Sequence, residues 1–296
     1  MRLYTIKYEG REVVAVENSD NQLCILSTAG ITVQDMNDLI CRYKDLKDEI
    51  VELINSNECK RIAINGCDIL APIPVPFKDI ICLGVNYRDH IEETVNVIDF
   101  TKKADTVYFS KRVNRCTDPG GIIPEYDFVD SLDYEVELGV IIGRDAYNVS
   151  PNEADDFIFG YTIINDVSAR NIQLKHHQWF RGKSLDGYTP MGPCIVTRDE
   201  ITDAGKLDIS CYVNDETRQK SNTAFMITTV NEAISELSQG MTLNAGTVIA
   251  TGTPGGVAMG MKNPAYLKDG DVVKCVIDGI GELTNTVGKA GQNEIR

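Results

Sequence analysis

Histidine is scarce in this sequence, and long apolar runs are missing. Only three histidines occur, His90, His176 and His177, so a metal centre with two or three histidine ligands at helical spacing is hard to build. No apolar run approaches the ~18 residues that a transmembrane helix needs. The first residues, MRLYTIKYEG, lack the apolar core of an export signal. We therefore expect a cytoplasmic protein with no membrane partner.

The cysteines form no CxxC pair, and their number is odd. The nine positions are Cys24, Cys41, Cys59, Cys67, Cys82, Cys116, Cys194, Cys211 and Cys275. This scatter argues against a zinc ribbon and against a framework of disulfides. Thiols of this kind suit a reduced compartment, which agrees with the expected cytoplasmic location.

Positive charge is also in deficit. The chain carries 29 basic and 44 acidic residues, a formal net charge of -15, and it has no basic patch interleaved with aromatic residues. A field of this sign repels phosphate backbones and anionic membranes, so no nucleic-acid partner is expected. An anionic substrate would have to be attracted by a metal ion or by local lysine and arginine.

The 296 residues predict one large domain and one small one. Apolar residues alternate in three short strands at 3–8, 11–17 and 22–27, and helical periodicity follows at 33–54. The segment PIPVP at 72–76 interrupts regular structure. We interpret residues 1–70 as a small α+β N-terminal domain and residues 71–296 as the second domain.

The second domain has many short apolar strands separated by Gly, Asp and Pro. The expected strands are 134–142, 158–165, 193–197, 207–213, 247–251, 271–277 and 282–287. A helix is indicated at 150–158 by a capping box and a proline at the first helical position, and another at 229–239 by its apolar face. Text rich in strands and poor in helices predicts a β-sandwich, roll or barrel, and so a strand-rich α+β protein.

Two glutamates stand in the apolar strand DYEVELGVIIG at 133–143. Side chains alternate in a strand, so Glu135 and Glu137 share one face with Cα atoms ~6.5–7 Å apart. Carboxylates this close repel unless a cation or proton lies between them, and hard divalent cations prefer such oxygen ligands. The alternative is a solvated strand face. Because Gly139 and Ile141 continue this face, a pocket wall is favoured.

A third acidic residue, Asp166, ends the apolar strand of GYTIINDVSARNIQ at 160–173. Asn165-Asp166 taken alone is more typical of a turn than of a ligand site. In combination with the two glutamates, Asp166 could supply a third oxygen ligand for the same cation.

An acid–base pair is indicated in CLGVNYRDHIEE at 82–93. Glu93 lies at i+3 from His90 and can share its helical face, whereas Glu92 at i+2 cannot. A carboxylate beside an imidazole fixes its tautomer and makes a usable general base. An ordinary His–Glu pair on a surface helix is the alternative.

Two further segments contain candidate residues. Lys183 stands in WFRGKSLDGYTPMGP at 179–193, a sequence that we interpret as too rich in Gly and Pro for a helix. This lysine could meet a carboxylate or polarise a carbonyl, and a solvated loop lysine is the alternative. ATGTPGGV at 250–257 is a glycine-rich loop that allows close approach of a ligand, or simply a tight turn. It is no phosphate loop, because no Gly-Lys-Ser/Thr follows.

Taken in order, these segments resemble the fumarylacetoacetate hydrolase family. The elements are GVNYRDHIEE, DYEVELGVIIG, GYTIINDVSARNIQ, QWFRGKSLDG with YTPMGP, TGTPGGV and the closing PAYLKDGDVVKCVIDGIGELTNTV. The resemblance covers roughly residues 75–290. It implies a mixed β-roll or β-sandwich catalytic domain, paired as a homodimer, behind a small N-terminal domain.

The resemblance also implies roles for individual residues. By position, Glu135, Glu137 and Asp166 resemble the carboxylates that bind Mg²⁺ or Mn²⁺. Lys183 resembles the lysine beside the metal that contacts substrate oxygens. Further family positions are matched by Gln173 and Thr253, which would orient the substrate, and by His90 and Glu93, an H-x-x-E dyad on a lid that activates water in some members.

The implied activity is metal-dependent cleavage of a C–C bond in a small anionic 2-oxo or β-dicarbonyl acid, by acylpyruvate hydrolysis or oxaloacetate decarboxylation. Isomerisation of 2-hydroxyhepta-2,4-diene-1,7-dioate, sugar-acid dehydration and ureidoglycolate cleavage are alternatives, because a fold does not fix a function. Outside enzymes, the alternative is a non-catalytic binding protein that keeps the fold. The sequence departs from the family pattern in the doubled acid HIEE and in the loop GGVAMGMK at 255–262.

Overall fold

The computed structural model describes residues 1–56, 58–94, 105–176 and 178–289. Its main element is a long mixed sheet, whose strands are, in order of pairing, β4 (Arg61–Ala63), β3 (Gln22–Ile25), β2 (Arg11–Glu17), β1 (Arg2–Tyr8), β13 (Met191–Thr197), β11 (Ile158–Asn165), β10 (Val136–Ile142), β16 (Val248–Ala250), β6 (Ile80–Gly84) and β7 (Val107–Lys111), with β5 (Asp68–Leu70) on β1. The path ends at β4 and β7, so this sheet is not a closed barrel.

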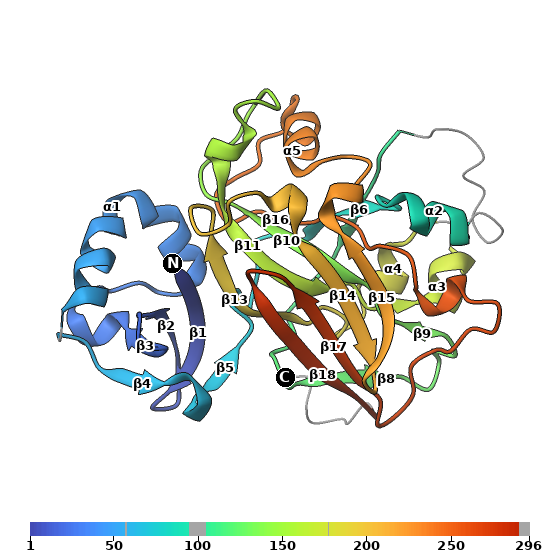
Figure 1. Ribbon diagram of the computed structural model, residues 1–296, viewed down its shortest axis with the longest axis horizontal. Helices are drawn as coiled ribbons and strands as arrows, with labels where there is room; N and C mark the ends of the chain where they lie inside the picture. Colours follow the sequence, from blue (N-terminus) through green and yellow to red (C-terminus); the bar gives the residue numbers. More distant parts are fainter. Residues whose placement is uncertain (57, 95–104, 177, 290–296) are drawn as a thin grey trace.

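A second sheet packs against the long one. Its strands are β15 (Glu216–Asn222), β14 (Asp208–Val213), β17 (Val272–Ile277), β18 (Gly281–Lys289) and β8 (Ile122–Glu125). In Figure 1 these strands cross in front of β10 and β11. Leu138 of β10 and Cys211 of β14 belong to the same buried core. This stacking of two mixed sheets confirms the strand-rich α+β class and the layered fold.

In the part of the chain that the structure describes, five α-helices and several 3-10 helices accompany the sheets. The helices are α1 (Met36–Asn55), α2 (Arg88–Thr94), α3 (Arg170–Lys175), α4 (Phe180–Lys183) and α5 (Val230–Ser238), and the 3-10 helices are η1 (Leu26–Ala29), η2 (Ile64–Gly66), η3 (Ala154–Phe157), η4 (Ala204–Lys206), η5 (Thr223–Phe225) and η6 (Ala258–Gly260). Within the described residues, no helix is long and apolar enough to span a membrane.

The prediction of a helix at 150–158 is wrong. Glu153 Oε2 accepts the backbone N–H and the hydroxyl of Ser150, which is only half of a capping box, and the short 3-10 helix η3 follows. The apolar run that starts at Ile158 is already β11, so no length remains for an α-helix. The second expected helix forms as α5, with a complete capping box between Thr229 and Glu232.

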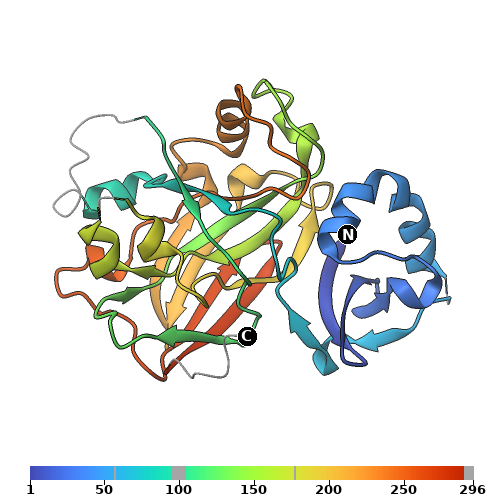
Figure 2. The same ribbon diagram turned by 180° about the vertical axis from the view of Figure 1, so that it is seen from behind.

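The N-terminal segment is joined to the long sheet. β1 pairs with β13, with Leu3 opposite Ile195, and Tyr43 of α1 packs edge-on against Phe159 of β11 at 4.9 Å between ring centroids. Figure 1 shows β1–β5 and α1 on one side of the molecule, with α2, α3 and α4 at the opposite end, and Figure 2 shows the same separation from behind. The boundary at residue 70 stays a prediction.

Candidate active site

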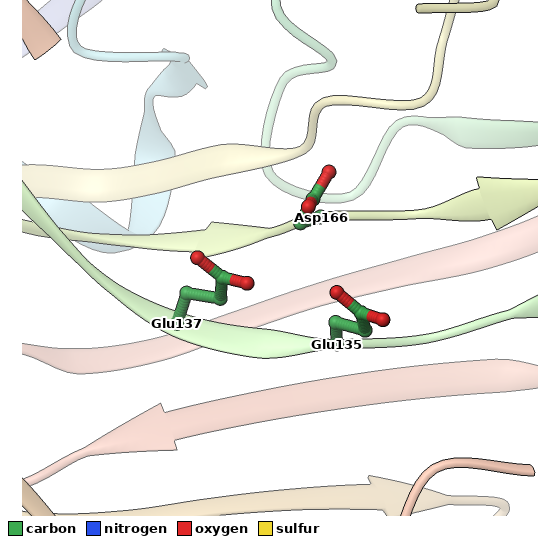
Figure 3. Close-up of side chains that lie close together, drawn as sticks. All are labelled: Glu135, Glu137 and Asp166. Atoms are coloured by element: carbon green, nitrogen blue, oxygen red, sulfur yellow. The ribbon is translucent and has the colours of Figure 1, made fainter. Parts of the chain in front are cut away.

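Three carboxylates meet where two central strands end. Val136 of β10 lies opposite Asn165 of β11, so Glu135 and Asp166 stand at adjoining strand ends, and Glu137 follows on the same face. One carboxylate oxygen from each of Glu135, Glu137 and Asp166 lies within 4.8 Å of the other two, and all three residues are buried. Figure 3 shows the three side chains close together on neighbouring parts of the chain. The alternative of a solvated strand face is therefore excluded.

Two of these carboxylates are paired with buried cations. Lys183 Nζ lies 2.6 Å from Glu135 Oε2 and 2.7 Å from Asp166 Oδ2. Arg170 Nη2 lies 2.6 Å from Glu135 Oε1, and Lys111 Nζ lies 2.6 Å from Asp166 Oδ1. Burial opposes ionisation of Glu135, but Lys183 and Arg170 outweigh it and hold the pKa of this carboxyl at about 2.

Glu137 is the exception, because it has no ion pair with any cation among the described residues. Its Oε2 accepts the backbone N–H of Gly252 at 2.8 Å. Burial and the charges of Asp166 and Glu135 raise the pKa of Glu137 well above its usual value. Glu137 is thus a buried carboxylate that lacks a cation and lies beside two others. The three together form an all-oxygen donor set that fits a hard divalent metal.

Lys183 lies at the end of a short helix rather than in a loop. The prediction that the Gly- and Pro-rich sequence would form no helix is wrong, since α4 ends at Lys183. Gly182 makes this possible, because a Cβ at this position would lie 2.6 Å from the backbone nitrogen of Gln173 in α3. The two helices pack closely, and the lysine is 2% exposed rather than solvated.

The His90–Glu93 pair forms as the helical spacing predicts. His90 Nδ1 lies 2.8 Å from Glu93 Oε1, and Glu93 Oε2 accepts the backbone N–H of Gly256 at 2.7 Å. The ring of His90 is buried. The dyad therefore packs against the glycine-rich loop that follows β16 and is not exposed on a surface helix.

Thr253 and Gln173 both line the same pocket. The hydroxyl of Thr253 donates to the backbone oxygen of Val136 at 2.9 Å and accepts from the amide of Gln219 at 2.7 Å. Gln173 accepts from Arg170 Nη1 at 3.0 Å. Both side chains are thus held in place by neighbours that also hold the carboxylate strand.

The pocket is small and has an aromatic wall. Trp179 and Phe109 meet edge-on with ring centroids 5.2 Å apart, and the pocket contains all the predicted site residues except Glu93 and Asp166. Its cavity volume of about 20 Å³ is space for roughly one water molecule. Binding of a 2-oxo acid therefore requires side chains around this pocket to move apart.

Three buried residues of the site were not singled out from the sequence. Arg170 stands within the segment GYTIINDVSARNIQ, and Asp133 precedes the two glutamates in their strand sequence. Lys111 ends the strand β7, where a lysine after VYFS could have signalled a buried charge. Asp133 and Lys111 are both 0% exposed, and Arg170 is 2% exposed.

The comparisons with known proteins define the class. A family model described as the C-terminal region of fumarylacetoacetate (FAA) hydrolase matches residues 79–288. This chain belongs to the fumarylacetoacetate hydrolase family of enzymes.

One curated relative and two solved structures are similar to this chain over most of its length. The chain is 45% identical over 219 residues to oxaloacetate tautomerase YisK of Bacillus subtilis (strain 168), covering 74% of this chain and 72% of that protein. The structure of fumarylacetoacetate hydrolase from Exiguobacterium antarcticum matches with a TM-score of 0.83 and 37% identity, over 98% of this chain and all of that one. Maleylpyruvate hydrolase from Sphingobium sp. SYK-6, in complex with manganese(II) and pyruvate, matches with a TM-score of 0.81 and 27% identity, over 98% and 100% of the two chains.

Proposed function

We propose that this enzyme uses a divalent cation, Mg²⁺ or Mn²⁺, to cleave a C–C bond in a small anionic 2-oxo acid, by hydrolysis of an acylpyruvate or decarboxylation of oxaloacetate. The proposal rests on one observation, the buried group of Glu135, Glu137 and Asp166 beside Lys183. Manganese and pyruvate in the complex of the related maleylpyruvate hydrolase support the choice of metal and substrate class.

Glu135, Glu137 and Asp166 would hold the cation. When bound there, it supplies positive charge that polarises the 2-oxo group and stabilises an enolate. Lys183 adds a charge at the same place, because Asp166 and Glu135 raise its pKa against the effect of burial and keep it protonated. Arg170 and Gln173 line the pocket together and suit a substrate carboxylate.

The His90–Glu93 dyad would handle the proton. An ionised carboxylate can only accept hydrogen bonds, so with Glu93 ionised and His90 neutral the contact between them would place the imidazole proton on Nδ1. The other ring nitrogen, Nε2, then takes the proton from water and activates it for attack on the substrate. The buried position of the ring excludes bulk solvent from this transfer.

Keto–enol tautomerisation of oxaloacetate is a second candidate. It is favoured by the 45% identity to the Bacillus tautomerase, and it needs the same enolate stabilisation without delivery of water. A non-catalytic binding protein is disfavoured, because every matched position keeps the expected residue type. We propose further that the enzyme is a cytoplasmic homodimer without nucleic-acid or membrane partners.

The test is a substrate panel of acetylpyruvate, oxaloacetate and 2-hydroxyhepta-2,4-diene-1,7-dioate, assayed with Mg²⁺, with Mn²⁺ and with EDTA. We expect metal-dependent consumption of acetylpyruvate or oxaloacetate. The variant Glu135→Ala should lose this activity at saturating Mg²⁺, whereas Glu236→Gln, an exposed site on α5, should keep it. Activity that persists in EDTA or in Glu135→Ala would refute the proposal.

A further inference from the structure

Asp133 is a fully buried carboxylate that faces four hydrogen-bond donors. Its Oδ1 accepts the backbone N–H groups of Tyr134 at 3.0 Å and Ala258 at 2.9 Å. Its Oδ2 accepts the backbone N–H of Met259 at 3.0 Å and Arg170 Nε at 2.9 Å. Only an ionised carboxylate offers enough acceptor sites for this arrangement. Asp133 lies two residues from Glu135 in the sequence and is assigned no role in the chemistry proposed above.

One of these bonds, from Arg170 Nε, leads to the metal-site carboxylates. Arg170, which Asp133 holds through Nε, contacts Glu135 through Nη2 at 2.6 Å and Gln173 through Nη1 at 3.0 Å. The guanidinium is planar and rigid, so fixing one edge fixes the direction of the other.

Two other bonds, from the backbone N–H groups of Ala258 and Met259, lead to the acid–base dyad. Ala258 and Met259 belong to η6, in the loop that follows β16. The same loop supplies the N–H of Gly256 to Glu93 Oε2 at 2.7 Å. It also packs against this glutamate, because a Cβ on Gly260 would lie 2.6 Å from Glu93 Cδ. The loop that Asp133 binds therefore also binds Glu93, and Glu93 in turn contacts His90.

We propose that Asp133 is a positioning residue that fixes the His90–Glu93 dyad relative to the carboxylate group. It acts through the amides of Ala258 and Met259 and touches neither substrate nor metal. This inference rests on the proposed function of the dyad. It also gives a role to the loop GGVAMG at 255–260, whose sequence departs from the family pattern. Asp133 binds this loop, and the loop in turn fixes the orientation of Glu93 and His90.

The decisive variant is Asp133→Asn, which keeps the size of the side chain. The amide oxygen can serve only one of the two former oxygen positions. In either orientation the new NH₂ group therefore faces one loop amide, that of Ala258 or that of Met259. We expect kcat to fall about 10–100-fold, with KM changed much less, because the dyad acts in the chemical step.

A readout that needs no substrate is the ¹⁵N NMR signal of His90. The chain has only three histidines, so a His90→Gln variant assigns the peak. In the wild type we expect the Nδ1–H tautomer, and in Asp133→Asn a mixture of tautomers, because Glu93 is no longer fixed. When Glu93→Gln is already present, adding Asp133→Asn should lower kcat by a factor at least tenfold smaller than in the wild type. The reason is that both substitutions release the same histidine.

Two further variants keep the test decisive. Thr223→Val removes a buried acceptor for the N–H of Leu207 outside the site, so it should lower the melting temperature without changing the His90 signal. If Asp133→Asn does not fold, Ala258→Pro removes one donor and leaves the charge. Proline is tolerated at the first position of a helical turn, and this variant should also give the mixed tautomers.

An unchanged His90 signal in the folded variants, or losses of kcat that simply multiply in the double variant, would overturn the role of Asp133. Failure of the substrate panel would instead overturn the proposed function, and the NMR result would still stand on its own.

Discussion

Replacing Glu137 by Gln should have opposite effects on the metal-free and the metal-loaded protein. Two unit charges 4.8 Å apart repel by about 3.5 kcal/mol at an effective dielectric constant of ~20. Glu137 faces two such charges, those of Glu135 and Asp166, while Lys183 offsets part of the repulsion. A glutamine removes the charge and can still accept the N–H of Gly252. We therefore expect the metal-free protein to gain about 1–3 kcal/mol at neutral pH.

The same substitution should weaken metal binding. It removes one of three anionic ligands, and a loss of at least ~3 kcal/mol corresponds to about 100-fold in the dissociation constant. Thermal unfolding in EDTA should show the melting temperature of Glu137→Gln raised by about 2–6 °C. Titration calorimetry with Mg²⁺ and Mn²⁺ should show the loss of affinity, and the stabilisation that these ions give the wild type should disappear.

Glu135→Gln is the matched contrast, because it leaves Arg170 and Lys183 with one anionic partner fewer. It should destabilise the metal-free protein by about 3–5 kcal/mol. The reasoning would fail if Glu137→Gln lowered the melting temperature in EDTA, or if it bound Mn²⁺ as tightly as the wild type.

Two further predictions concern charge in the same site. Lys111→Met should lower the free energy of unfolding by about 3–5 kcal/mol, because Asp166 Oδ1 loses its buried cation; urea unfolding measures this, and a change below about 1 kcal/mol would contradict it. Because burial and the nearby carboxylates raise the pKa of Glu137, metal must displace its proton as the pH falls. Affinity for Mn²⁺ should therefore decrease between pH 8 and pH 5, with proton release detectable by calorimetry in buffers of different ionisation enthalpy, and a flat profile without release would exclude this linkage.

The direction of side chains along one strand can be predicted from sequence, because it is a local property. Glu135 and Glu137 share a face for this reason, and the i+3 spacing of His90 and Glu93 works in the same way on a helix. These local relations hold whichever strands become neighbours. The sequence therefore predicts which residues act together within a segment.

Pairing between distant segments is not local. Lys111 reaches Asp166 only because β7 follows β6, β16 and β10 across the long sheet, and no pattern in residues 107–111 specifies that order. The short helix α4 depends on a glycine that allows packing on α3, so its formation is a tertiary effect that overrides local propensity. Asp133 was likewise not singled out, because its partners Ala258 and Met259 lie 125 and 126 residues further along the chain.

The charges that surround the pocket predict the order in which ligands bind. In the group of Asp133, Glu135, Glu137, Asp166, Lys111, Arg170 and Lys183, four acids face three cations. With His90 neutral, the net charge of this group is -1 when Glu137 is ionised and zero when it is protonated. A divalent cation makes the local charge positive, whereas the whole chain, at -15, repels an anion throughout. Pyruvate should therefore bind only after the metal. Trp179 is the only tryptophan and lines the pocket, so its fluorescence should respond to pyruvate in Mg²⁺ and not in EDTA. An equal response in EDTA would show that lysine and arginine alone attract the substrate.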